Sequence, residues 1–191
     1  RESVKGEVSD LHFDKKIRKL FIGTFMRGIM VYDMNTKSVI RPDYNLKDIS
    51  ITRFKPLNDK ELLIATDGGG VHKINMDTYQ IVPEIVADYN SNCGMNGNSI
   101  NDIFVDDEER IWLANYPIGI PIQNNRYTSY KWIKHSIGNK QSLINDQVNA
   151  IIEDREGDLW FATNNGISFF NSKTGQWRSV LSAFEESQGN K

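Results

Sequence analysis

Cysteine is almost absent from this sequence of 191 residues, and the single Cys93 can form no internal disulfide. No apolar run approaches the roughly 18–20 residues that span a bilayer, and Arg1–Val8 lack the apolar segment of a signal peptide. Neither sign of charge dominates, because 23 Lys and Arg stand against 25 Asp and Glu. We therefore expect a soluble chain, and nucleic acid is a poor candidate partner because no basic stripe is present.

The composition is otherwise that of a globular protein. Hydrophobic residues make up 39% of the chain, charged residues 25% and aromatic residues 10%. This balance excludes a disordered polyelectrolyte and a membrane-embedded chain. The length is consistent with one domain, or with a row of small repeats that share a core.

No residue pattern indicates catalysis or a metal site. The three His residues lie far from Cys93 in the sequence, and none is part of a nucleophile motif. Asp154, Gly157 and Asp158 resemble a calcium loop only superficially, because two carboxylates fall well short of the six to eight oxygen ligands that calcium takes. We expect no catalytic residue, no metal and no cofactor.

Four copies of one pattern occupy the chain. The two clearest copies run from Ile100 to Ile120 and from Val148 to Ile167, and fainter ones include Leu20–Ile29 and Leu62–Val71. One anchor residue per copy is followed by Gly three or four places later, and the spacings between anchors are 42, 49 and 48 residues. The anchors are Thr24, Thr66, Asn115 and Thr163.

Each copy predicts four antiparallel strands, because its apolar segments are short, β-branched or aromatic, and bounded by turn residues. In the last copy the strands are expected at 148–153, 159–163, 167–171 and 177–180. Fourth strands of the earlier copies are expected at 38–42, 79–86 and 128–134. Helix should be nearly absent.

Repeats of about 40–50 residues with four strands each are typical of β-propeller blades. We therefore predict an all-β fold of four four-stranded antiparallel blades over residues 1–181, as a fragment of a larger propeller. The approximate blade boundaries are 8–46, 47–97, 98–141 and 142–181, and a polar C-terminal tail follows at 182–191. Open blade faces are apolar, so we expect self-association or contact with the remaining propeller blades.

Several recurring residues are expected to serve packing. Small residues at one place in each copy should let neighbouring blades approach, so replacing them with Leu should cost about 1–3 kcal/mol. They are Gly23, Ala65, Ala114 and Ala162. The Thr that follows is expected to hold a turn backbone through its hydroxyl. Trp112 and Trp160 lie inside predicted strands, which favours blade packing over ligand stacking.

The last copy resembles the two-component regulator propeller repeat. It reads Asp-Arg-Glu-Gly-Asp-Leu-Trp-Phe-Ala-Thr within Asp154–Ile167, after the Asn-containing segment Ser142–Val148. The family pattern is an Asn-rich loop, a strand, Asp-x-x-Gly-x-Leu-Trp-Ile-Gly-Thr and then Gly-Leu. The copy around Trp112 fits less closely, with Asn115 in place of Thr, and the first two copies lack the Trp. The resemblance covers about residues 8–180.

Proteins similar to this family carry such propellers in the periplasmic sensor region of hybrid two-component system histidine kinases, chiefly in gut Bacteroidetes that sense polysaccharide breakdown products. The resemblance implies that this chain is a ligand-sensing periplasmic segment of an inner-membrane receptor that responds to oligosaccharides. It implies no catalysis in this segment. Kinase activity and membrane attachment would belong to the rest of the receptor, and an oligosaccharide or a partner subunit would be bound.

In a four-stranded blade, the loops into first strands share one face with the loops between second and third strands. The candidate ligand-binding residues on that face are Asn101, Tyr116, Asn145, Asp146 and Asn164. Asn amides both donate and accept hydrogen bonds, which suits sugar hydroxyls. Asn also tolerates turn backbones, so a structural role stays open for each of these residues.

Two other function classes remain open. A propeller polysaccharide lyase or glycosidase would need convergent acids over the channel, and Asp10, Asp102 and Asp146 near the first strands are candidates. These Asp residues occur once per blade near the first strand, and a structural feature of the repeat explains that recurrence more simply than catalysis does. The second class is a WD-repeat-like protein-interaction scaffold, which a sugar-dependent shift in melting temperature would distinguish from a sugar sensor.

Overall fold

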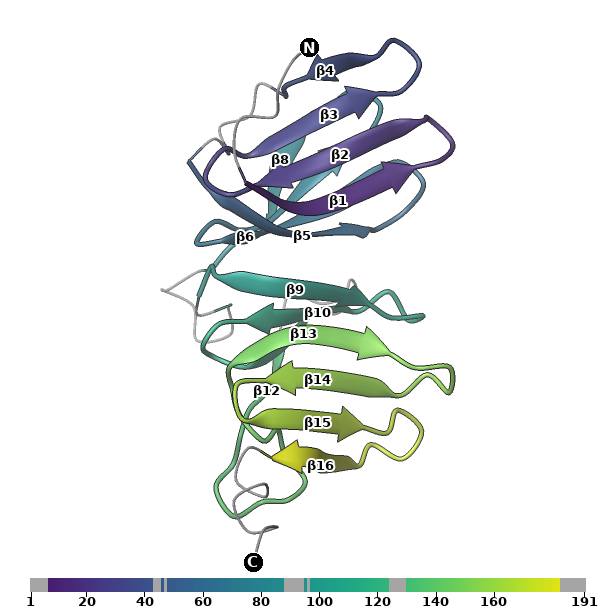
Figure 1. Ribbon diagram of the computed structural model, residues 1–191. Coiled ribbons are helices and arrows are strands. Elements are labelled where there is room, and N and C mark those ends of the chain that lie inside the picture. The colour runs from purple at the N-terminus through teal and green to yellow at the C-terminus, as the bar shows by residue number, and fades with distance from the viewer. Residues whose placement is uncertain are drawn as a thin grey trace, which may run out of the picture. The chain divides into compact units, whose positions relative to one another are not determined.

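The computed structural model describes residues 7–42, 46, 48–87, 95, 97–123 and 130–182 (Figure 1). These residues form four four-stranded antiparallel sheets and no helix, which confirms the all-β prediction. Within the same ranges, no helix is present that has the length and apolarity needed to cross a bilayer. Cys93 and most of the predicted tail, 183–191, lie outside the described residues.

The chain divides into two compact units. One unit holds sheets 1 and 2 together with Gly97–Ile100, and the other holds sheets 3 and 4 from Asn101 onward. Sheet 1 consists of β1 (Val8–Asp14), β2 (Lys19–Thr24), β3 (Ile29–Asp33) and β4 (Ser38–Ile40). Sheet 2 consists of β5 (Ser50–Pro56), β6 (Glu61–Asp67), β7 (Gly70–Asn75) and β8 (Ile81–Ile85).

The second unit repeats this order. Sheet 3 consists of β9 (Ile100–Val105), β10 (Ile111–Asn115), β11 (Ile120–Gln123) and β12 (Tyr130–Ile133). Sheet 4 consists of β13 (Val148–Glu153), β14 (Leu159–Thr163), β15 (Gly166–Phe170) and β16 (Trp177–Ser182). The predicted strands of the last copy differ from these bounds by at most two residues. In sheet 2 the fourth strand begins later than predicted, because Tyr79 has a φ of 61° and closes the preceding turn.

Apolar side chains fill the space between the two sheets of each unit. In the first unit, Phe21 of β2 packs in one buried cluster with Ile51 and Phe54 of β5. In the second unit an aromatic cluster joins sheets 3 and 4, and the ring centres of Trp112 and Phe161 lie 6.3 Å apart. Burial of this apolar surface is the main stabilising contribution.

A carboxylate on the first strand ties neighbouring sheets together in both units. Asp10 of β1 accepts a hydrogen bond of 2.7 Å from the backbone N–H of Phe54 on β5. Asp102 of β9 accepts one of 2.9 Å from the N–H of Ile151 on β13. We call this place in the repeat the clamp position, and in sheet 4 it is occupied by Ala150, directly after the same register shift that precedes Asp10.

The hairpin between the first and second strands is organised by one Asp. The Asp154 carboxylate accepts bonds from the backbone N–H groups of Glu156 and Asp158, both 3.0 Å, and from the Trp160 indole N–H at 2.7 Å. Gly157 closes this turn with a φ of 81°, a conformation that costs glycine little. The spacing Asp-x-x-Gly-x-Leu-Trp therefore has a structural reason. It lets one Asp carboxylate bind both the turn backbone and the Trp ring of the same hairpin.

Asp106 plays the same role in sheet 3. Its carboxylate accepts bonds from the Trp112 indole at 2.8 Å, from the Arg110 side chain at 2.7 Å, and from the N–H groups of Glu108 and Arg110. Burial raises the pKa of Asp106, but the bonds from Trp112 and Arg110 outweigh burial and hold the pKa below its ordinary value. The ionised form is therefore favoured in the folded chain.

Threonine after the second strand holds the next turn, as predicted. Its hydroxyl donates to the carbonyl of the following Gly in three sheets, from Thr24 to Gly28 at 2.8 Å, from Thr66 to Gly70 at 2.7 Å and from Thr163 to Gly166 at 2.8 Å. The prediction for the small residue before it holds for Gly23, which lies against Ile51 of sheet 2, and for Ala114, which is buried in the cluster between sheets 3 and 4. It is wrong for Ala162, which is exposed because no other sheet covers that face of sheet 4 in the described structure.

Substituting Gly23 with Leu should lower the free energy of unfolding by roughly 1–3 kcal/mol through overpacking. A Cβ at Gly23 would lie 2.7 Å from Cγ2 of Ile51, so the sheets of the first unit would have to move apart. The matched substitution Ala162→Leu should change stability by less than about 0.5 kcal/mol, because that site is exposed. Urea unfolding of dilute protein measures both, and equal losses would contradict this account of the packing.

Substituting Asp106 with Ala should destabilise the second unit by roughly 2–3 kcal/mol, because buried donors lose a charged acceptor. Asp107→Ala, on an exposed residue of the same turn, is the control and should be close to neutral. Because folding lowers the pKa of Asp106, its contribution is present above the unfolded pKa of about 4 and is lost as pH falls toward the folded value. Thermal melts from neutral to acidic pH should therefore show the wild-type advantage shrinking in acid.

Candidate ligand-binding site

The structure brings the predicted loops of the second unit together at one end of its sheets. We call this end the rim, and it consists of Asn101, the turn Tyr116–Gly119, the segment Asn145–Gln147 and the turn Asn164–Asn165. Asn101 donates from Nδ2 to the carbonyl of Val148 at 3.1 Å. A Cβ at Gly119 would lie 3.5 Å from Asp146, and the N–H of Asn164 donates to the carbonyl of Gln147.

Three of the predicted residues hold the backbone of the rim. The Asn101 amide bridges the first strands of sheets 3 and 4, as described above. Asn145 accepts the N–H of Gln147 on its side-chain oxygen at 2.8 Å, which closes a turn before β13. Asp146 accepts the N–H of His135, just after β12. These three residues thus have the structural role that the sequence left open. A ligand at the rim would bind loops whose backbone they hold.

Asn164 belongs to a row of amides at the rim. Its oxygen accepts from Nδ2 of Asn149 at 2.8 Å, and its own Nδ2 donates to Oε1 of Gln147 at 2.8 Å. Asn149 and Asn164 are exposed and Gln147 is half-buried. Sequence reasoning missed Asn149 and Gln147. The repeat is the signal that could have found Asn149, because this residue occupies the position of Asn101, which was already a candidate.

Tyr116 is the aromatic residue of the rim. It exposes 41% of its surface at the start of the turn that joins β10 to β11. That turn is held by backbone bonds, since the N–H groups of Ile118 and Gly119 both donate to the carbonyl of Asn115. An exposed ring on a fixed turn is suited to stacking against a sugar ring.

The three Asp residues considered as convergent acids do not share one role. Asp10 and Asp102 occupy the clamp position and bind backbone N–H groups of a neighbouring sheet. Asp146 lies four residues before the corresponding position, Ala150, and binds the backbone after β12 instead. The equivalence that the sequence suggested for Asp146 is therefore wrong, because this residue belongs to the loop and not to the first strand.

A cavity of about 610 Å³ opens at the other end of the second unit, where the β9–β10, β13–β14 and β15–β16 hairpins lie. Its floor includes the aromatic residues Trp112, Phe170 and Trp177, and its mouth includes Lys131 and Glu153. The volume is within the range of small-molecule sites, roughly 300–1,000 Å³. The sequence did not predict this cavity, because its aromatic residues occupy the same strand positions as residues of the hydrophobic core.

The two sites offer different chemistry. The rim presents amide donors and acceptors with one aromatic ring, and it suits a polyhydroxylated ligand. The cavity presents an apolar floor below charged groups, and the Asp106 carboxylate at its wall is already bound by Arg110 and Trp112. Both sites thus have polar atoms, and those of the rim are amides, which both donate and accept hydrogen bonds.

Comparison with known proteins gives one family match and several structural likenesses. The family described as "Two component regulator propeller" matches residues 142–165. Histidine kinase P4 of Formosa agariphila is 27% identical over 121 residues, which is 59% of this chain and 9% of the kinase.

Two solved structures share the fold. The extracellular domain of BT3049 from B. thetaiotaomicron, described as a hybrid two component system, has a TM-score of 0.59 at 19% identity, over 93% of this chain and 29% of that one. PorZ, a surface component of the type-IX secretion system of Porphyromonas gingivalis, has a TM-score of 0.64 at 19% identity, over 91% and 27%. The chain thus spans less than a third of each of these relatives. The β-propeller blade fold and the resemblance to the two-component regulator propeller family, predicted from the repeats, are both confirmed, the latter by the match at residues 142–165.

Proposed function

We propose that this chain is part of the periplasmic sensor region of a hybrid two-component receptor, and that it binds an oligosaccharide without catalysis. The observation that carries the proposal is the regulator propeller repeat at residues 142–165. The similarity to a histidine kinase over 59% of the chain supports it. In such a receptor the kinase and the membrane attachment lie in other parts of the protein.

The rim is the proposed sugar site. Asn149 and Asn164 are exposed, and a primary amide has two N–H groups and two lone pairs, so each keeps hydrogen-bonding capacity beyond the bonds within the row. Tyr116 adds an exposed ring. In this arrangement Asn101, Asn145 and Asp146 position the loops, while Asn164 and Tyr116 contact the ligand.

The roles of the acidic residues support the non-catalytic part of the proposal. A glycosidase or lyase uses carboxyl groups that can approach the substrate. Asp102 is buried and accepts backbone bonds on both oxygens, from Ile103 and from Ile151. Asp10 accepts the N–H of Phe54 in the same way.

Calorimetric titration with a panel of plant and host oligosaccharides tests the proposal. Tyr116→Ala and Asn164→Ala should each weaken binding about 5–10-fold, the loss expected for one stacked ring or one or two net hydrogen bonds. Gln176→Ala is the control, because it removes an exposed amide from the opposite end of sheet 4 and should leave affinity unchanged.

A third variant separates the rim from the cavity. If Lys131→Ala abolishes binding while the two rim variants bind normally, the ligand occupies the cavity and the assignment to the rim is wrong. Failure of every sugar to bind would refute the sensing role of this segment. Release of shortened or unsaturated sugars would refute the non-catalytic assignment.

A further inference from the structure

The cavity at the hairpin end of the second unit has both of its walls within this chain. One wall is a cross-strand row of sheet 3, and the other is a row of sheet 4. The sheet 3 row consists of Trp112, Ile122 and Lys131. The sheet 4 row consists of Glu153, Leu159, Phe170 and Trp177. The cavity is therefore a feature of the contact between two neighbouring blades, at the end opposite the rim.

The turn between the third and fourth strands has the same geometry in both units. Tyr79 and Gly175 both take the left-handed backbone conformation there, with φ of 61° and 71°. Each donates its N–H at 2.8 Å to the carbonyl of an Asn four residues earlier, Asn75 in the first unit and Asn171 in the second. The two turns therefore correspond residue by residue, and Gly175 stands where the first unit has Tyr79.

In the first unit, side chains of this turn complete the core. Met76 is 3% exposed within the buried cluster, and Tyr79 packs against that cluster. The corresponding residues of sheet 4 are Ser172 and Gly175, and both line the cavity. A Cβ at Gly175 would have no atom within 4 Å apart from its neighbours in the chain. The cavity thus lies where the first unit holds a thioether and a phenol ring.

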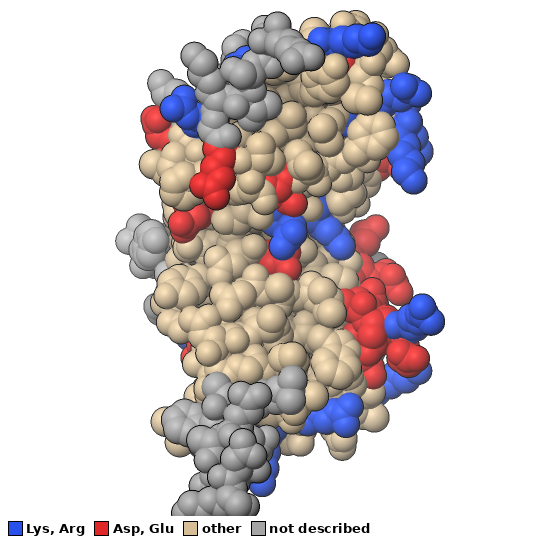
Figure 2. Space-filling view, in the orientation of Figure 1, with Lys and Arg blue, Asp and Glu red and all other residues tan. Residues whose placement is uncertain are grey.

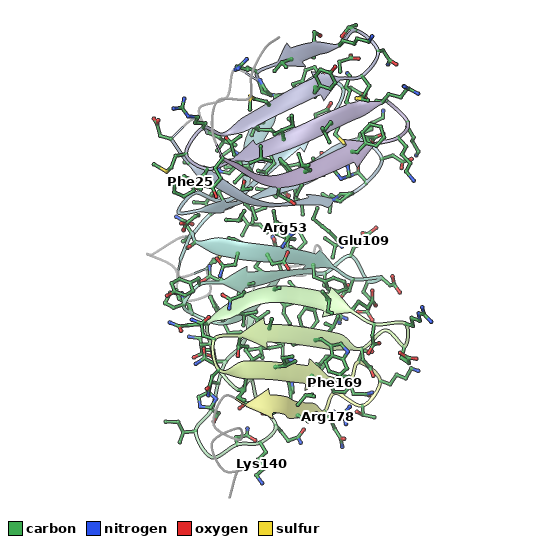
Figure 3. The ribbon with its side chains drawn as sticks, in the orientation of Figure 1. Phe25, Arg53, Glu109, Lys140, Phe169 and Arg178 are labelled. Carbon is green, nitrogen blue, oxygen red and sulfur yellow. The ribbon has the colours of Figure 1, made fainter. Side chains whose placement is uncertain are left out.

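A cation faces the aromatic ring in the first unit, because the Lys19 ammonium lies 4.8 Å from the centre of the Tyr79 ring. Arg110 corresponds to Lys19, since each follows the left-handed residue of the first hairpin, Glu109 with φ of 59° and Arg18 with φ of 55°. Figure 3 labels Glu109 in this hairpin, and Figure 2 shows acidic and basic side chains gathered at this end of the second unit. Arg110 lines the cavity, so a ring bound at the place of Tyr79 would lie beside a guanidinium, which attracts aromatic faces.

The floor of the cavity is a cluster of rings in contact. The ring centres of Phe170 and Trp177 lie 4.8 Å apart, and those of Trp112 and Phe170 lie 6.0 Å apart. These distances are those of packed aromatic pairs, so no ligand can enter between the rings. A ligand ring would lie on the cluster and extend its aromatic contacts.

Two positions that are apolar in the first unit carry charges at the walls of the cavity. In the cross-strand pairing, Lys131 corresponds to Ile40 and Glu153 corresponds to Pro56. Lys131 and Glu153 are exposed, and neither forms an ion pair with another residue that the structure describes. A ligand with one charge of each sign would pair with both side chains through charge-assisted hydrogen bonds.

We propose that this cavity binds an aromatic amino acid, with its ring at the place that Tyr79 occupies in the first unit, its carboxylate on Lys131 and its ammonium on Glu153. The volume of about 610 Å³ accommodates one such molecule. The site lies at the opposite end of the sheets from the rim, so it is separate from the sugar site proposed there. It does not depend on whether the rim binds a sugar.

Calorimetric titration of the 191-residue chain with L-phenylalanine and three analogues tests the proposal. 3-Phenylpropionate lacks the ammonium, phenethylamine lacks the carboxylate, and cyclohexylalanine lacks the aromatic ring. The first two should bind at least about tenfold more weakly than phenylalanine, because each loses one charged hydrogen bond. Cyclohexylalanine should bind about 3–10-fold more weakly, since it loses the aromatic contacts. Failure of phenylalanine to bind at millimolar concentration, or equal binding of all four compounds, would overturn the proposal.

Two substitutions test the contact assigned to each charge. Lys131→Ile restores the residue type of the first unit, and it should weaken phenylalanine and 3-phenylpropionate about tenfold without weakening phenethylamine. Glu153→Gln should weaken phenylalanine and phenethylamine without weakening 3-phenylpropionate. Lys140→Ile is the control, because Lys140 is exposed, does not line the cavity and lies far from Glu109 in Figure 3. Equal effects of Lys131→Ile and Glu153→Gln on all three ligands would contradict the assigned contacts.

Filling the cavity as the first unit does provides an independent check. Gly175→Tyr places a phenol ring there, and the conformation of Tyr79 shows that the turn accepts this residue. The variant should lose measurable binding of phenylalanine. Gly138→Tyr is the matched control, since Gly138 has a φ of 78°, equally open space at its Cβ and no place in the cavity wall, and it should bind normally. Circular dichroism verifies that both variants fold, and normal binding by a folded Gly175→Tyr chain would overturn the proposal.

Discussion

The hydrogen bond that a first-strand Asp accepts from the backbone of the next sheet is the constraint on which the packing of both units depends. The Asp10 and Asp102 carboxylates lie between sheets whose core contacts are apolar and non-directional. A bond with a charged acceptor contributes about 1.5–3 kcal/mol and, unlike apolar contact, requires one register. In the second unit Asn101 adds a bond in the opposite sense, from its side chain to the carbonyl of Val148. The small residues at Gly23 and Ala114 can then pack closely, because the sheets do not slide.

The motif that identifies the repeat family has a structural cause. In Asp-x-x-Gly-x-Leu-Trp the carboxylate of Asp154 reaches the N–H groups two and four residues ahead and the indole six residues ahead. Moving the Trp by one position would place its ring on the other face of the strand. The motif therefore specifies a hairpin and a packed ring, and it carries no information about a ligand. The ligand contacts proposed above, Tyr116 and Asn164, lie instead at positions that vary between copies.

The sequence predicts local structure here better than it predicts neighbours. Strand positions and the Thr turns follow from side-chain pattern and short-range bonds, and the four-stranded order is correct in all four sheets and the Thr turn in the three sheets that have Thr. Ala162 is the counterexample, because its repeat position implies burial and its sheet has no described neighbour on that side. The equivalence suggested for Asp146 was wrong, and the cavity near Trp112 was missed, for a related reason. Their surroundings depend on which loops and sheets meet, and spacing along one chain does not specify that.

Asn149 shows how one repeat position changes its role with its surroundings. It occupies in sheet 4 the position that Asn101 occupies in sheet 3, where the amide donates across to the next sheet. In sheet 4 the same amide donates to Asn164 beside the rim. The same residue type thus ties two sheets together in one repeat and joins a row of surface amides in the next, so the repeat position alone does not specify its partner.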